Sequence, residues 1–379
     1  MKILHLYRDL FGKGGIPHQT RRLIEGQVNL GHEVVTTSLD GEVKTDFITA
    51  NPVVQVEVIT NDLSGVKNLR SYLRTHKIDL VHITGLWIPL HQLWAREVVR
   101  AGIPYVVSTH GNLSPIGMKV RFGEKKTHFY HILAKRLWHR WLDLPLLRRA
   151  IGVHAHSKYE SELLTSAGIE NTFVAPAGVD DAWLNLAGVG RRQYHRRVTF
   201  LHLGRLDIYH KGLDLIYEAA KKLVSAGLGE QCKFLLVGPT VNNSKATLQR
   251  GASKLGCGTL EIRDAVWGKD KVPLWGEADY FLNLYRFAGI ALTPCEAIGS
   301  GLPLLASREG NMGDWTAEAN MGWAVPLDGQ RLYDLLKHIL SLSEEDYCRF
   351  SNNAWNFARA NSWTNVSQKV IDGYSRLLN

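Results

Sequence analysis

The chain is patterned as short, continuously apolar runs that alternate with longer stretches of helical periodicity. In the first half these runs are rich in Val, Ile and Leu, with little alternation between apolar and polar positions. Because a strand with two buried faces reads as a continuous apolar run, the pattern predicts a parallel sheet covered by helices on both sides. The strands predicted for the first half are residues 2–7, 33–39, 53–59, 79–84, 105–111, 152–157 and 172–178.

The alternation restarts after a polar segment. Residues 187–197, "AGVGRRQYHRR", are rich in Gly and Arg and are interpreted as a linker. The chain is therefore predicted to be an α/β protein of two Rossmann-like βαβ domains, residues 1–187 and 198–361, facing each other across a cleft. Ligands are then expected in the cleft, at the carboxyl ends of the strands. The strands predicted for the second half are residues 198–204, 233–239, 259–266, 280–287, 302–307 and 323–327.

Composition agrees with a globular two-domain chain and narrows its partners. The 379 residues are 45% apolar and 21% charged, which suits two domains of common size and argues against disorder. The four cysteines form no Cys-x-x-Cys pair, which argues against a disulfide framework or a zinc site and fits a reducing compartment. The N-terminal "MKILHLY" is interpreted as a strand and not as a signal, and no run of 18 apolar residues predicts a membrane span. The net charge of +9 favours anionic partners.

A glycine-rich turn, "DLFGKGGIPHQTRRL", follows the first strand and opens a helix. Gly12, Gly14 and Gly15 allow close approach of the backbone, and the helix start offers unpaired N–H groups at the positive end of its dipole. These features suit an anion site, although a glycine turn after a first strand is as often only a turn. The stretch is neither G-x-G-x-x-G nor a P-loop, so it lacks the motif of a dinucleotide or P-loop protein.

Two cations follow the first strand of the second half. In "HLGRLDIYHKGLDLIYEAAKKL", Arg205 and Lys211 lie six residues apart in a polar loop. From the carboxyl edge of a sheet, an arginine fork and a lysine charge could share a diphosphate. The alternative is a solvated loop with ordinary surface charges, and the Gly-Arg and Lys-Gly frame favours the phosphate interpretation.

Two histidines and one acid complete the candidates. His110 ends a predicted strand in "STHGNLSPIG", where its ring could hydrogen-bond a sugar hydroxyl or a phosphate oxygen, or could simply be packed. His82 has the same setting and a weaker claim. Glu296 is interpreted as starting a helix, where its carboxylate could accept hydrogen bonds from the vicinal hydroxyls of a ribose. Its alternative role is an acid that only complements the helix dipole.

In this order and spacing, these features resemble those of the retaining nucleotide-sugar glycosyltransferases of GT-B fold, in the large family four group. The resemblance runs nearly from end to end, and the closing residues 362–379 are similar to that group's C-terminal helix, which crosses back to the first domain. Each stretch is unspecific alone, and the ordered series is specific. The matching stretches are "GGIPHQTRRLIEGQVNLGHEVV", "IDLVHITGLW", "YVVSTHGNLSP", "VAPAGVDDAWL", "LGRLDIYHKGLDLIYEAAKKL", "LLVGP", "RFAGIALTPCEAIGSGLPLLAS" and "NSWTNVSQKVIDGYSRLL".

The resemblance implies a role for each matching residue. The catalytic group would be Arg205 and Lys211, which hold the diphosphate and stabilise it as leaving group, together with His110, which contacts the donor sugar. Glu296 would bind the ribose, and the base would lie near Asp264 to Trp267. The donor-binding residues implied in this way are Gly14, Gly15, Arg205, Lys211, Trp267, Gly289, Ile290, Ala291, Leu292 and Glu296.

The resemblance also implies that neither a metal nor a cofactor is needed besides the nucleoside diphosphate sugar, which is a co-substrate. The cation pair and the helix dipoles would neutralise the developing diphosphate. The chain contains no Asp-x-Asp, the metal-holding signature of the other common transferase fold.

One position departs from the family pattern. The family has a Glu-x7-Glu motif whose first carboxylate contacts hydroxyls of the donor sugar, and aligning its second Glu on Glu296 places Ala288 at the first. Either the donor sugar is held in another way and activity is retained, or the site is weakened or dead. The presence of Arg205, Lys211, His110 and Glu296 favours retained activity.

Residues 118–150 are basic and aromatic. From Met118 to Arg149 nine Lys or Arg stand against two acids, and Phe129, Leu133, Leu137 and Trp141 recur every four residues. The segment is interpreted as an amphipathic basic helix, for which Trp138 and Trp141 could serve as anchors on an anionic membrane surface. The alternative, a helix whose apolar face packs on its own domain and whose basic face is solvated, is slightly favoured. Nucleic acid is not expected as a partner, because no binding motif accompanies the charge.

The sequence thus predicts a cytoplasmic, retaining, metal-independent glycosyltransferase, peripheral at the inner face of the membrane if residues 118–150 bind it. It would move a sugar from a nucleoside diphosphate to a glycan or lipid-linked acceptor, in envelope or exopolysaccharide synthesis. The alternatives are a non-catalytic sugar-nucleotide-binding protein and, less favoured because Ala288 removes a carboxylate, a nucleotide-sugar epimerase.

Overall fold

The computed structural model describes residues 1–12, 14–38, 54–58, 63–120, 128–185, 197–256, 258–288 and 292–379. By its contacts the chain divides into two compact units. The first comprises Met1–Met118, His128–Gly178 and Asn361–Asn379, and the second comprises Lys119–Thr127 and Val179–Ala360. The expected linker at 187–197 lies outside the described residues except for Arg197, as do the predicted site residues Gly289, Ile290 and Ala291.

The first unit is built on a parallel sheet of seven strands in the order β3-β2-β1-β4-β5-β6-β7. All seven predicted strands are present, because each is an apolar run whose two faces are both covered. Their bounds are β1 Lys2–Leu6, β2 Glu33–Ser38, β3 Gln55–Val58, β4 Leu80–Thr84, β5 Tyr105–Ser108, β6 Gly152–Ala155 and β7 Thr172–Val174.

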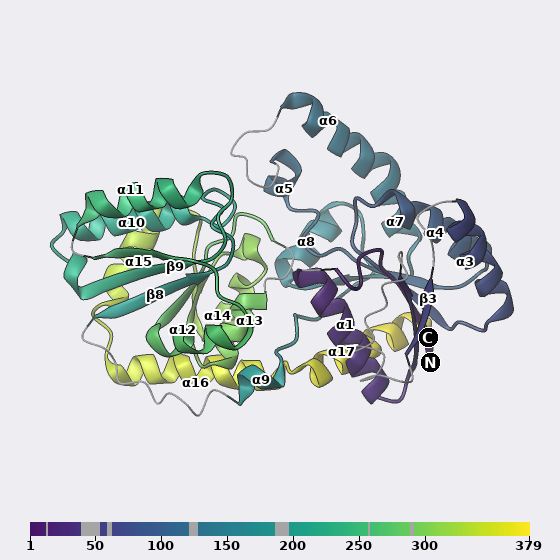
Figure 1. Ribbon diagram of the computed structural model, residues 1–379. Helices are drawn as coiled ribbons and strands as arrows, with labels where there is room; N and C mark the ends of the chain where they lie inside the picture. The colour runs from purple at the N-terminus through teal and green to yellow at the C-terminus, as the bar shows by residue number, and fades with distance from the viewer. Residues whose placement is uncertain are drawn as a thin grey trace. The chain divides into compact units, whose positions relative to one another are not determined.

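Helices cover both faces of this sheet. One face packs on α3, α4, α7 and α8, and the opposite face packs on α1 and α17. Figure 1 shows α1 and α17 side by side, and they meet closely at Gly26, where a Cβ would lie 2.0 Å from Ser367 Oγ. The helices of this unit are α1 Gly15–Asn29, α3 Leu63–Thr75, α4 Pro89–Arg100, α5 Pro115–Lys119, α6 Phe129–Trp138, the π turn His139–Asp143, α7 Leu144–Arg149, α8 Lys158–Ser166 and α17 Trp363–Leu378.

A row of buried polar side chains crosses the first sheet and ties α17 to it. His82 in β4 accepts at Nδ1 from Tyr374 of α17 (2.5 Å) and donates from Nε2 to Ser108 Oγ in β5 (2.6 Å). Ser108 in turn donates to His154 Nδ1 (2.9 Å), whose Nε2 donates to the Ala175 carbonyl (3.0 Å). This single direction of donation requires neutral imidazoles, and burial lowers the pKa of His82 and His154 accordingly. Both ring nitrogens of His82 are thereby used, so the weaker prediction that His82 binds ligand is wrong.

The second unit is built on a parallel sheet of six strands in the order β10-β9-β8-β11-β12-β13. The six predicted strands are again all present. Their bounds are β8 Val198–Leu203, β9 Cys232–Val237, β10 Leu260–Arg263, β11 Tyr280–Asn283, β12 Leu304–Ala306 and β13 Gly322–Ala324.

This sheet is also covered twice. Phe200 and Phe234 pack under α10, α11 and α15, while Trp275 of α12 packs on Phe281 from the other side. The helices are α9 Asp181–Leu184, α10 Leu213–Ser225, α11 Ser244–Leu255, α12 Val272–Glu277, α13 Leu292–Gly299, α14 Gly313–Glu318, α15 Gly329–Ile339 and α16 Glu344–Ala360, with 3₁₀ turns at Gly229–Gln231, Gly268–Lys271 and Arg308–Gly310.

Both units are therefore Rossmann-like, and the predicted α/β fold class is confirmed. Strand order reverses beside β1 in the first sheet and beside β8 in the second. From each of these strands the chain builds outward on one side, through β2 and β3 or β9 and β10, and then continues on the other side with β4 or β11. The loops after these strands are the positions where such folds bind ligands. Among the described residues no helix is both long and apolar enough to cross a membrane.

Candidate functional site

The second unit brings Arg205 and Lys211 to the reversal point of its sheet. Both lie in the loop between β8 and α10, which is folded back by a hydrogen bond from Lys211 N to the Asp207 carbonyl (2.9 Å). Lys211 is buried, and its ammonium lies 3.4 Å from the centroid of the Tyr285 ring, which follows β11. Arg205 is exposed. The structure thus joins the two strand ends, β8 and β11, through a cation on an aromatic face.

The site is electrostatically prepared for an anion. Burial, together with the nearby charge of Arg205, lowers the pKa of Lys211 to about 7, while Asp207 acts in the opposite direction. Removing an ammonium from water beside a second cation disfavours its charged form. A diphosphate would supply the negative charge that this position lacks.

Tyr285 is a site residue that the sequence analysis missed. Burial raises the pKa of Tyr285 to about 12, while a hydrogen bond with Thr293 and the charge of Arg205 lower it and Glu296 raises it. The ring therefore lies among Arg205, Lys211 and Glu296. The only signal in the sequence is an aromatic residue two positions after a buried strand, which is too common to be informative.

Glu296 lies in the second turn of α13, not at its start as predicted, because α13 begins at Leu292 in the described chain. The dipole role is therefore wrong for this residue, since that effect is confined to the first turn. Instead, both carboxylate oxygens accept from Lys271 Nζ (2.8 and 2.9 Å). A ribose at Glu296 would have to share these oxygens with Lys271, a second residue that the sequence analysis did not identify.

The predicted base region is exposed. Trp267 precedes the 3₁₀ turn that carries Lys271, and its indole is 69% exposed. Asp264 forms an exposed ion pair with Lys245. The exposed Trp267 ring is therefore accessible for stacking. The same loop carries Lys271, which forms the ion pair with Glu296.

The described residues at and just before Ala288 are held by side chains from other segments. Arg286 binds both oxygens of Asp214 (2.7 and 2.8 Å) and lies over the Tyr209 ring. The Ala288 carbonyl accepts from Asn311 Nδ2 (3.0 Å). The alanine therefore stands in an ordered backbone setting in which its side chain contributes no charge.

The first unit carries the remaining predicted residues. Gly14 adopts a φ of 130° as the N-cap of α1, a conformation that favours glycine, and Gly15 is the first residue of the helix. Pro17 in the same turn has no N–H, so fewer donors point out of this helix start than in an ordinary one. His110 is buried in a turn after β5 with a φ of 50°, and its Nδ1 has no hydrogen-bond partner among the described residues.

Glu160 holds the His110 turn and was not predicted. Its carboxylate accepts from Thr109 Oγ1 (2.6 Å) and Gly111 N (2.5 Å), on the two sides of His110, and from His156 N (2.7 Å). Burial alone would raise the pKa of Glu160, but the hydrogen bonds and charge from His156 and the bond from Thr109 outweigh it and lower the pKa to about 2. Burial lowers the pKa of His110 well below its usual value, so the ring is neutral.

Of the predicted residues, the second unit thus brings together Arg205, Lys211 and Glu296 around Tyr285. Gly14, Gly15 and His110 belong to the first unit, where the sequence predicted their turns but not the carboxylate that organises one of them. Within the described parts of the chain there is no group of three or more His, Cys, Asp or Glu side chains arranged to hold a metal.

Family models match both units. A glycosyl transferase 4-like domain matches residues 14–178, and the glycosyl transferases group 1 domain matches residues 197–342. Together they span most of the chain, which belongs to the group 1 glycosyltransferases of GT-B fold. The predicted family and the activity class, sugar transfer from a nucleotide donor, are confirmed at this level. Comparison with curated protein sequences finds no match.

Solved structures of the same fold cover the whole chain. Sucrose-phosphate synthase from Thermosynechococcus elongatus is 16% identical with a TM-score of 0.72, covering 99% of this chain and 98% of its own. Anabaena HepE in complex with UDP is 19% identical with a TM-score of 0.71, covering 99% and 100%. WaaG, a glycosyltransferase involved in lipopolysaccharide biosynthesis, is 17% identical with a TM-score of 0.59, covering 98% of both chains. At these identities the likeness establishes the fold.

We expect nucleoside diphosphate binding to take up a proton on Lys211. With a pKa of about 7 in the free protein, Lys211 is mostly neutral at higher pH, and a bound diphosphate favours the charged form. Affinity for UDP should therefore fall as pH rises above 7, by up to about tenfold per pH unit until the pKa of the complex is reached. Calorimetry in buffers of different ionisation enthalpy measures the uptake, and Lys211→Met should abolish it. Wild-type affinity that is flat across this range would contradict the assignment.

Glu160→Gln should disorder the His110 turn while leaving the second unit unchanged. An amide has one acceptor oxygen, and its NH2 would face donors, which costs about 1–3 kcal/mol of unfolding free energy. The transfer rate should fall at least about tenfold, in the range given by a misplaced positioning group, with UDP affinity retained. Urea unfolding, turnover and UDP titration are compared with Glu162→Gln, an exposed acid on the same helix. Full turnover in Glu160→Gln would show that the turn does not depend on this carboxylate.

Proposed function

We propose that this protein is a retaining glycosyltransferase that needs no metal and transfers a sugar from a nucleoside diphosphate to a glycan or lipid-linked acceptor. The observation that carries the proposal is the pair of Arg205 and Lys211 at the end of β8, with Lys211 buried against Tyr285. Two cations at a sheet reversal point are suited to a leaving diphosphate, whose charge grows as the glycosidic bond breaks.

The roles of the remaining groups follow from their settings. Lys211 would be charged once the diphosphate is bound and would stabilise the oxygen that leaves the sugar. His110 would meet the donor sugar as a neutral ring, able to donate or accept a hydrogen bond without adding charge. In front-face transfer the leaving diphosphate itself takes the proton of the acceptor hydroxyl, so that no carboxylate base is required at position 288.

The absence of a metal requirement rests on charge. In metal-dependent transferases a divalent cation neutralises the diphosphate, whereas here the two side-chain cations Arg205 and Lys211 would do so. Addition of EDTA should therefore leave the rate unchanged.

The acceptor and cellular setting are proposed at a coarser level. WaaG acts in lipopolysaccharide biosynthesis, and by analogy we assign this chain to envelope or exopolysaccharide synthesis in the cytoplasm, at the inner face of the membrane. Ala288 points to a donor sugar whose hydroxyls are held by other groups, and Asn311, which donates to the Ala288 carbonyl, is a polar side chain at this position.

A panel of nucleoside diphosphate sugars, tested for hydrolysis and for transfer to a membrane extract, decides between an enzyme and a binding protein. We expect turnover with one donor, and a loss of on the order of a hundredfold in kcat/KM for Arg205→Ala combined with Lys211→Met, about 3 kcal/mol. The matched control, Arg250→Ala with Lys254→Met, removes two exposed cations from α11 of the same unit. Binding without turnover for every donor would contradict catalysis, and a near-normal double variant would contradict the role of the pair.

Glu296 is tested by its dependence on the ribose hydroxyls. If Glu296 accepts from them, Glu296→Ala should weaken binding of UDP by about 1.5–3 kcal/mol, as expected for hydrogen bonds to a charged group. The same variant should bind 2′,3′-dideoxy-UDP as the wild type does. Titration of both nucleotides against both proteins completes a thermodynamic cycle. Equal losses for the two nucleotides would place the ribose elsewhere.

A further inference from the structure

Helix α6 presents its large apolar side chains to solvent. Phe129, Tyr130, Leu133, Leu137 and Trp141 are 74%, 62%, 45%, 49% and 69% exposed. These five are more than half of the large hydrophobic residues that are exposed in the described chain, and all lie within one stretch of α6 and the π turn that follows it. We call this row the α6 stripe. Figure 1 shows α6 running outward from α7, away from the sheet of its unit.

The polar side of the same segment faces the protein. Asp143 is buried and accepts from Trp138 Nε1 (3.1 Å), while His139 stacks on Trp87 with ring centroids 6.1 Å apart. The alternative in which the apolar face packs on its own domain is therefore wrong. Trp138 is half-buried and its N–H is used within the protein, so its anchoring role stays a prediction. Trp141 alone of the two tryptophans is presented outward.

A π turn fixes this orientation. Pro145 has no N–H to give to the Trp141 carbonyl, and Leu144 N bonds to the His139 carbonyl, five residues back. The wider turn brings Trp141 to the foot of the α6 stripe and Asp143 to the interior. The missing N–H of Pro145 and the part-buried hydrogen bond between Trp138 and Asp143 thus set the outward position of the stripe.

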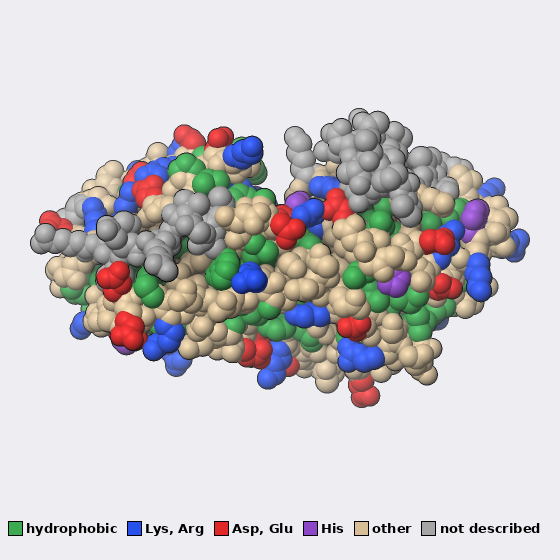
Figure 2. All heavy atoms as spheres, turned by 90° about the horizontal axis from the view of Figure 1, so that it is seen from below, with side chains coloured by type: hydrophobic (Ala, Val, Ile, Leu, Met, Phe, Trp, Pro, Cys, Tyr) green, Lys and Arg blue, Asp and Glu red, His purple; other side chains and the backbone are tan. Residues whose placement is uncertain are grey.

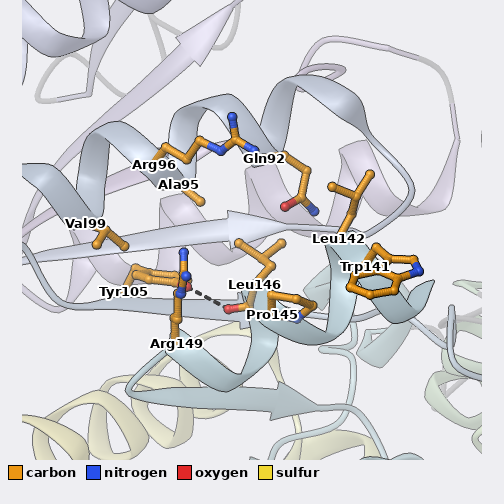
Figure 3. A pocket seen from close by; sticks show the side chains of 10 residues that line it. All are labelled: Gln92, Ala95, Arg96, Val99, Tyr105, Trp141, Leu142, Pro145, Leu146 and Arg149. Atoms are coloured by element: carbon orange, nitrogen blue, oxygen red, sulfur yellow. Dashed lines mark hydrogen bonds between the residues drawn. The ribbon is translucent and has the colours of Figure 1, made fainter. Parts of the chain in front are cut away.

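A pocket of about 250 Å³ lies at the foot of the stripe, between α4 and α7. Leu146 and the ring of Tyr105, whose hydroxyl donates to the Leu146 carbonyl (2.6 Å), form an apolar part of its lining. Figure 3 shows Arg149 beside the Tyr105 ring, Arg96 on the α4 side and Trp141 at the far end. None of the residues predicted for the donor site lines this pocket.

The charge around the stripe and pocket is positive. Between residues 128 and 149 five Lys or Arg side chains stand against one acid, the buried Asp143. Neither Arg96 nor Arg149 pairs with a carboxylate of the described residues, and both are exposed. Figure 2, which looks from the side of α16 and α17, shows basic and acidic side chains mixed within each unit.

We propose that the α6 stripe and this pocket form a docking surface for a bilayer of anionic phospholipid. The apolar row enters the acyl boundary, and the guanidinium groups of Arg96 and Arg149 hold a headgroup phosphate in the pocket. An anionic bilayer satisfies both kinds of side chain on this surface. The protruding Phe, Leu and Trp side chains are stabilised in an apolar phase, and the flanking cations, which have no carboxylate partners among the described residues, are stabilised by negatively charged headgroups. The proposal adds a membrane-binding surface to the proposed function. It depends on that function only for the assignment to the inner face of the membrane.

Vesicle flotation of the full-length protein tests the surface. We expect binding to vesicles that contain phosphatidylglycerol, little binding to phosphatidylcholine alone, and weaker binding at high salt. Replacing Leu133, Leu137 and Trp141 by Gln should lower the partition coefficient at least about tenfold, since each removes an apolar group from the boundary. These positions are exposed, so the variant should fold as the wild type does. The matched control replaces Val174 and Leu378, exposed apolar residues of the same unit, by Gln.

A second set of variants tests the pocket. Arg96→Gln with Arg149→Gln should reduce the preference for phosphatidylglycerol vesicles several-fold, whereas Arg74→Gln with Lys77→Gln, exposed cations of the same unit, should change it less. Inorganic phosphate should release no more protein than sodium chloride of equal ionic strength, because the site takes a headgroup within a bilayer.

Several results would overturn the proposal. One is that the wild-type protein does not float with phosphatidylglycerol vesicles at low salt, and another is that the stripe variant floats as well as the wild type. They also include concentration-dependent dimerisation that the stripe variant abolishes, and RNA binding that displaces vesicles. UDP affinity is measured on every variant. Lost flotation with retained UDP binding leaves the proposed function standing, while retained flotation without turnover on any donor would refute that function and leave the docking surface intact.

Discussion

Strands buried on both faces leave no room for an unpaired charge within the sheet, and the whole molecule is arranged around this constraint. Three of the buried polar side chains of the first sheet, His82, Ser108 and His154, are neutral and joined by successive hydrogen bonds, the last of which ends on a backbone carbonyl. Charged groups that could act on a substrate are therefore displaced to the ends of the strands, which is where Arg205 and Lys211 appear.

In the second unit one of these displaced charges is held in an unfavourable setting. Lys211 is buried against an aromatic ring and beside another cation, and this lowers its pKa although Asp207 acts in the opposite direction. An apo protein that holds such a group is prepared for a ligand with the opposite charge, because binding relieves a cost already present in the fold. In the first unit the prearranged group is uncharged: His110 is neutral, and its turn is held by the ionised carboxylate of Glu160.

The sequence predicted the elements well and the side-chain environments poorly. All thirteen strands follow from apolar runs, because burial on two faces leaves a direct trace in composition. Glu160, Tyr285 and Lys271 could not be predicted, because their partners are distant in the chain and come together only in the fold. The α6 segment shows the limit of periodicity: its amphipathic pattern was recognised, but only Pro145 and the buried Asp143 decide which side faces water.

The central claim is that Lys211 is a strained cation at the diphosphate site. Its ionisation can be followed directly by NMR of the lysine ε-carbons, with Lys211→Met providing the assignment. We predict a pKa near 7 in the free protein, as its burial beside Arg205 implies, and a rise of at least about one unit on saturation with the nucleoside diphosphate. A value near that of an ordinary lysine in the free protein, unchanged by the nucleotide, would contradict the account.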